Sequence, residues 1–145
     1  MRTKLWKCPR CGAKLVHANM AHACGDFSED AFLASAGAKE RAIYDRFVAC
    51  IAACGPFDVA PAKTRVAFLV EVRFASVNRI GDGYVDVHLV LPRRIASARF
   101  RRVEQVGSVW VHHLRLGRVA DLDREARGWI RASYEEYGER RWLER

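Results

Sequence analysis

The sequence has little proline and no long apolar run. It contains four prolines, and its apolar runs, such as Val66–Val70, are far shorter than the about 20 residues that a membrane-spanning helix needs. Residues 1–7 lack the apolar core of a signal peptide. We therefore expect a chain that does not cross a membrane and that resides in the reducing cytoplasm.

Several familiar catalytic signatures are also missing. The chain has no phosphate-binding glycine loop and no HExxH metalloprotease motif. Its five cysteines cannot all pair in disulfides, and Cys50 and Cys54 stand one helical turn apart in an apolar run. This spacing is typical of two small residues on a buried helix face.

Basic residues outnumber acidic ones. The chain of 145 residues has 25 Lys and Arg against 17 Asp and Glu, a net charge of +8 at pH 7. Most of the excess is arginine, whose planar guanidinium suits two-pronged contact with phosphate. This charge balance favours a polyanionic partner, with nucleic acid foremost.

The strongest chemical pattern lies near the beginning of the chain. Cys8 and Cys11 form a Cys-x-x-Cys pair with Pro9 and Gly12, and His22 and Cys24 follow as His-x-Cys. Four such donors suit one tetrahedral zinc ion that leaves no position open for water. His17 is an alternative to His22 as the fourth ligand. We expect one structural zinc ion per chain.

The segment around these cysteines is rich in basic residues. Lys4, Lys7 and Arg10 surround the pattern, and Trp6 stands among them. A tryptophan among cations could stack on a nucleobase, and it could equally cover the small core of a zinc knuckle. We include all four residues in a candidate anion-binding surface.

The remaining periodicity predicts two domains. We expect a zinc knuckle over residues 1–25 and an α+β domain over residues 26–145. The helical pattern from Ala38 ends at Gly55-Pro56, and a second helix is expected from Asp121 to Gly138. Between them, alternation predicts a four-stranded antiparallel sheet made of two hairpins, with the flanking helices packed on one face; the strands are expected at residues 65–74, 85–91, 100–106 and 109–116.

The other face of the sheet is expected to be open to solvent or a ligand. Alternation places His113 and Arg115 on that face and their neighbour His112 in the core. Arg65 begins the first predicted strand and Lys63 stands just before it, so the cations Lys63, Arg65 and Arg115 could form one anion-binding patch that includes His113. Alternatively, the cations pair across strands with acidic residues and form a solvated face; the candidates are Glu71, Asp86 and Glu104.

The chain resembles a bacterial family of short proteins known as domain of unknown function 5655. The resemblance is carried by the segment from Trp6 to Gly12 and by residues 19–25, 61–68, 89–94 and 112–116. It implies the ligand set Cys8, Cys11, His22 and Cys24. The family has no established activity, so the resemblance implies the zinc site and the fold but no reaction.

Together these features predict a zinc-binding, non-catalytic module that binds an anionic partner, with nucleic acid as the expected partner. One alternative is an enzyme that acts on a phosphorylated substrate at the open sheet face, with His113 and arginines. A second alternative is an adaptor that binds another protein.

The zinc prediction is tested by elemental analysis of the purified protein, which should find one zinc ion per chain. Cys24→Ser should abolish binding, because Cys24 is a ligand whichever histidine completes the site. Loss of zinc in His17→Ala together with full retention in His22→Ala would show that His17 is the ligand.

Overall fold

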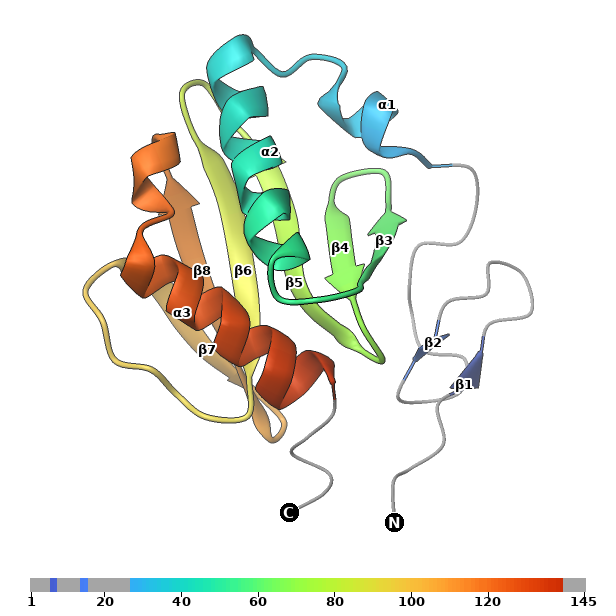
Figure 1. The fold of residues 1–145 in the computed structure, drawn as a ribbon, viewed down its shortest axis with the longest axis vertical. Coiled ribbons are helices and arrows are strands. Elements are labelled where there is room, and N and C mark those ends of the chain that lie inside the picture. Colours follow the sequence, from blue (N-terminus) through green and yellow to red (C-terminus); the bar gives the residue numbers. More distant parts are fainter. Residues whose placement is uncertain (1–5, 8–13, 16–26, 140–145) are drawn as a thin grey trace.

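The computed structural model describes residues 6–7, 14–15 and 27–139 (Figure 1). Over residues 27–139 the chain folds into a six-stranded antiparallel sheet with helices. The predicted α+β class is confirmed. The predicted four-stranded sheet of two hairpins is wrong, because the sheet has six strands. No metal site is found among the described residues, which do not include the ligands of the predicted zinc knuckle.

Capping residues mark some of the helix ends. Helix α1 spans Glu29–Leu33, and the Ser28 hydroxyl accepts a hydrogen bond from the Ala31 amide. Helix α2 spans Ala38–Ala52 and is followed by Gly55, whose φ of 148° favours glycine. Helix α3 spans Arg124–Ala132 and continues into a π-helical turn, η2, over Ser133–Gly138, after the short 3₁₀ turn η1 at Val119–Asp121.

The six strands are joined mainly by short turns. They are β3 (Asp58–Pro61), β4 (Val66–Leu69), β5 (Arg73–Ile80), β6 (Val85–Leu91), β7 (Phe100–Val106) and β8 (Val109–Leu116). Their order in the sheet is β3-β4-β5-β6-β8-β7, so β8 lies between β6 and β7. The segment between β6 and β7 must therefore carry the chain past β8 to the edge of the sheet.

Two strands escaped the sequence prediction for a physical reason. The apolar run predicted as one strand over residues 65–74 divides into β4 and β5, with a turn at residues 70–72. The backbone amides of Glu71 and Val72 donate to the carbonyl of Gly138, at 2.9 and 3.3 Å. The hydrogen-bonding needs of these two amides are met by Gly138, which is far away in the sequence, so a local sequence pattern cannot predict this turn. Strand β3 was missed because its four residues show no alternation.

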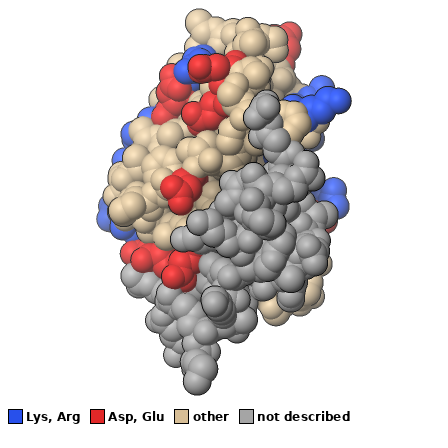
Figure 2. Space-filling view, turned by 90° about the vertical axis from the view of Figure 1, so that its right-hand side faces the viewer, with Lys and Arg blue, Asp and Glu red and all other residues tan. Residues whose placement is uncertain are grey.

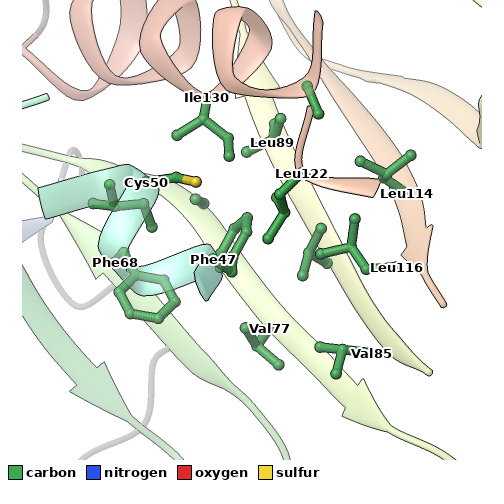
Figure 3. Packing of buried hydrophobic residues seen from close by; sticks show 14 of the residues in the cluster. Phe47, Cys50, Phe68, Val77, Val85, Leu89, Leu114, Leu116, Leu122 and Ile130 are labelled. Carbon is green, nitrogen blue, oxygen red and sulfur yellow. The ribbon is translucent and has the colours of Figure 1, made fainter. Parts of the chain in front are cut away.

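Helices α2 and α3 cover one face of the sheet, and the core lies between these two layers (Figure 1). In Figure 3, Phe47 of α2 and Ile130 of α3 point toward apolar side chains of the sheet. Phe68, Leu89, Leu114 and Trp129 belong to this core, and each is at most 8% exposed. Among the described residues, no helix is both long and apolar enough to span a bilayer.

Histidine 112 fixes the connection that passes β8. Its side chain is fully buried, and its Nε2 accepts a hydrogen bond of 3.0 Å from the Ile95 amide in the β6–β7 connection. Its ring also lies 4.9 Å from that of Phe100, at the start of β7. His112 is thus a structural residue, as alternation predicted.

Phe47→Ala tests the core between α2 and the sheet. Phe47 is fully buried and packs against Phe68, with 5.9 Å between ring centroids. The substitution should lower the free energy of unfolding by about 3–5 kcal/mol, because it leaves a cavity as well as losing apolar contact. Denaturant unfolding measures the loss.

The control for this measurement is Val106→Ala, because Val106 is 55% exposed. The free energy of unfolding of this variant should stay within about 0.5 kcal/mol of the unsubstituted protein. Equal losses in the two variants would contradict the placement of Phe47 at the centre of the core.

Candidate functional site

The predicted zinc ligands cannot be placed. Cys8, Cys11, His22 and Cys24, together with the rival His17, lie outside the described residues, as do the candidate anion-binding residues Lys4 and Arg10. Strands β1 (Trp6–Lys7) and β2 (Lys14–Leu15) pair antiparallel, so they bracket residues 8–13. For Trp6 and Lys7 only the backbone pairing is described. Zinc binding stays a prediction from the sequence.

The open face of the sheet carries a row of polar residues. The strand register places Ser76 of β5 opposite His88 of β6, His88 opposite His113 of β8, and His113 opposite Arg102 of β7. Residues paired in this way project from the same face of a sheet. Since Val87 and Leu114 face the helices, this polar row lies on the face that the helices leave uncovered.

Two β-bulges flank this row. In β5 the register shifts between Val77 and Arg79, so Asn78 is an extra residue in the ladder. In β7 it shifts between Phe100 and Arg102, so Arg101 is an extra residue. A bulge bends its strand and redirects a side chain, and bulges are common beside binding sites.

A groove runs over this part of the sheet. It consists of two adjoining hollows of about 430 and 360 Å³ that share Asn78 and His113. We call them together the sheet groove. Its lining comes from four neighbouring strands and from the β3–β4 connection; the polar lining residues are Thr64, Arg65, Asn78, Arg79, Asp86, His88, Arg101, Arg102, Glu104 and His113.

Two histidines form the centre of the sheet groove. The rings of His88 and His113 meet edge to face, with 5.7 Å between centroids. The Asn78 amide nitrogen lies 2.8 Å from His88 Nδ1, and Glu104 Oε1 lies 2.8 Å from His113 Nε2. Burial, followed by the nearby charges of His113 and Arg65, lowers the pKa of His88 to about 4. His88 is therefore neutral at physiological pH.

The two carboxylates of the groove are already occupied by cations. Asp86 accepts two hydrogen bonds from Arg115, at 2.8 and 3.0 Å, and the Arg115 guanidinium also lies 3.7 Å from the ring centroid of Tyr84. Glu104 accepts from Arg102 at 2.7 Å as well as contacting His113. These bonds, above all the one from His113, lower the pKa of Glu104.

Two arginines in the groove remain uncommitted. Arg65 and Arg79 are exposed, and neither makes an ion pair with another residue in the described part of the chain. Arg101 approaches Asp86 only at 3.8 Å. With two carboxylates each held by a cation, the groove presents a net positive surface to a ligand.

The structure brings some of the predicted surface residues together and separates others. Arg65 and His113 line the same hollow, whereas Lys63 is exposed in the β3–β4 connection and does not line the groove. Arg115 is committed to Asp86, as the alternative of cross-strand pairing required. Glu104 is paired as well, with Arg102 and His113, whereas Arg65 makes no ion pair with another described residue.

Sequence reasoning did not select Asn78, Arg79 or His88 as site residues. His88 could have been found, because alternation in residues 85–91 places it on the same face as Asp86. Asn78 could not, because the bulge that isolates it breaks the alternation. Arg79 follows the same bulge and was hidden for the same reason.

Net charge alone does not single out this surface. In the view of Figure 2, Asp and Glu side chains spread over the left half of the described surface, and Lys and Arg side chains project from both margins. Basic residues are therefore present on more than one face. The groove is distinguished by its shape and by the pairing within it.

A comparison with protein families finds one relationship. The model of the family described as a domain of unknown function (DUF5655) matches residues 29–136. This range contains every element from α1 to most of η2, and thus the whole sheet groove. No curated protein and no solved structure matches the chain.

The buried histidines predict sensitivity to mild acid. The pKa values of His88 and His112 are lowered, chiefly by burial, so the unfolded chain gains protons below about pH 6.5 that the folded protein does not. The free energy of unfolding should fall between pH 7 and pH 5, by at most about 1.4 kcal/mol per pH unit for each histidine. Partial exposure of His88 makes its share smaller.

Urea unfolding at both pH values measures this effect. His88→Gln removes one titrating group and can still bond to Asn78, so its stability should depend less on pH in this window. An identical pH dependence in the variant and the unsubstituted protein would contradict the protected, neutral state of His88.

Proposed function

The chain belongs to the family described as a domain of unknown function (DUF5655), and within this fold we propose that the sheet groove binds an anionic ligand, with nucleic acid as the ligand class. The observation that carries this proposal is a pair of exposed arginines in the sheet groove: Arg65 lines one hollow with His88 and His113, and Arg79 lines the adjoining hollow with His113. Each guanidinium is available for two-pronged contact with a phosphate.

The dimensions of the sheet groove suit an extended ligand. Its lining spans strands β5, β6, β8 and β7, and three strand spacings of about 4.8 Å give about 14 Å. This distance accommodates more than one phosphate of a single strand. An antiparallel sheet whose open face carries cations and flat rings is a frequent platform for single-stranded nucleic acid.

The histidine rings provide the uncharged part of the platform. A neutral His88 against His113 offers planar surface in the same groove as the arginines, where a nucleobase can stack without opposing charge. The zinc ion predicted at Cys8, Cys11, His22 and Cys24 has a structural role in this proposal, because four protein donors complete its coordination.

Charge reversal of the two uncommitted arginines tests the proposal. We titrate a labelled single-stranded RNA with the protein at several salt concentrations and compare it with the variant Arg65→Glu/Arg79→Glu. Binding of the unsubstituted protein should weaken as salt rises, because each phosphate contact releases counterions. In the variant, affinity should fall at least tenfold and the slope of log K against log salt should shrink by about two.

The matched control is Arg41→Glu/Arg131→Glu, which changes the net charge equally on helices α2 and α3. This variant should bind more tightly than the groove variant and keep the full salt slope. Absence of binding at low salt would overturn the proposal, as would equal weakening by the two double variants.

A further inference from the structure

Histidine 113 and Glu104 have the arrangement of a base and its orienting carboxylate. Glu104 Oε1 lies 2.8 Å from His113 Nε2, and because an ionised carboxylate can only accept, the neutral ring carries its proton on Nε2. The lone pair is then on Nδ1. Glu104 also stabilises the imidazolium that forms when Nδ1 takes up a proton.

Glu104 is itself held in place. Its second oxygen, Oε2, accepts from Arg102 at 2.7 Å, so the carboxylate is fixed between a guanidinium and an imidazole. Arg102 and His113 are register partners on the adjacent strands β7 and β8. The chain Arg102–Glu104–His113 is therefore built on the strands rather than on a loop, and strands position side chains accurately.

The groups around His113 favour a phosphate as the species beside it. Arg65 and His113 line the same hollow, and Arg79, Arg101 and Arg102 line the adjoining one with His113. On His88, the Asn78 amide nitrogen bonds to Nδ1, which places the proton of the neutral ring on Nε2. His88 can thus donate a hydrogen bond to a phosphate oxygen without adding charge.

We propose that the sheet groove cleaves single-stranded RNA, with His113 as the base that deprotonates the ribose 2′-hydroxyl next to a bound phosphate. This inference rests on the proposed binding of nucleic acid. RNA is the expected substrate because each ribose carries a 2′-hydroxyl next to a phosphate. A phosphate bound by the arginines would bring that hydroxyl close to His113. Deoxyribose lacks that hydroxyl, so DNA is a ligand and not a substrate.

The reaction is balanced without any further reactant. His113 takes the proton of the 2′-hydroxyl, the 2′-oxygen forms a bond to phosphorus, and the bond from phosphorus to the 5′-oxygen breaks. The proton passes from His113 through solvent to the departing 5′-oxygen. The products are a 2′,3′-cyclic phosphate and a 5′-hydroxyl, and His113 returns to its neutral state.

The test uses the full chain, a single-stranded RNA of mixed sequence and its all-deoxy counterpart. The RNA should be cleaved to fragments that end in 2′,3′-cyclic phosphate, and the DNA should be bound but stay intact. His113→Gln should slow cleavage of saturating RNA at least about 100-fold, the usual contribution of a general base.

Glu104 is a positioning residue, so its test includes the pH profile. Glu104→Gln should slow cleavage and displace the pH profile of the rate, because the carboxylate no longer stabilises the protonated ring. The titratable and charged groups that line the groove with His113 come from every neighbouring strand; they are Arg65, Arg79, Asp86, His88, Arg101, Arg102 and Glu104. The matched control is Glu125→Gln on α3, which should leave rate and profile unchanged.

The outcomes separate this inference from the proposed function. RNA that is bound but remains intact overturns the cleavage and leaves the binding. Failure to bind either oligonucleotide at low salt overturns both. Cleavage that persists in His113→Gln, or products that end in a 3′-hydroxyl, contradicts the role of His113, because such products require water as the nucleophile.

Discussion

The packing of α2 and α3 on a single face of the sheet separates the core side chains of β6 and β8 from those that line the groove. Successive side chains of a strand project from opposite faces. His112 and His113 are adjacent in sequence, yet the first is fully buried and bonded to the Ile95 amide, while the second lines a groove and contacts Glu104. If a helix covered the other face as well, there would be no site.

The groove depends on departures from that regularity. The bulges at Asn78 and Arg101 each add a residue to the ladder, on β5 and on the edge strand β7. Asn78 then reaches His88 Nδ1, and the hydroxyl of Ser76 contacts the Asn78 carbonyl oxygen at 3.0 Å. Local irregularity thus builds the polar network, and the regular strands around it keep that network in place.

The alternation of apolar side chains and the residues that end helices predicted most of the fold from the sequence. They located α2, α3, the β7–β8 hairpin and the burial of His112. They failed where distant residues decide the local structure: the turn between β4 and β5 depends on the carbonyl of Gly138. In the site, the alternation of side chains along the strands predicted Arg65 and His113. It could not predict Asn78, because the bulge at this residue breaks the alternation. The zinc pattern lies outside the described residues.

The location of nucleic-acid binding is the central claim, and heteronuclear NMR tests it most directly. Spectra of labelled protein are recorded while a short single-stranded oligonucleotide is added at low salt. We expect the largest chemical-shift changes at the ring signals of His88 and His113, at the Asn78 side-chain amide and at the backbone of Arg65. Changes confined to α2 and α3, with the two histidine rings unaffected, would contradict the claim.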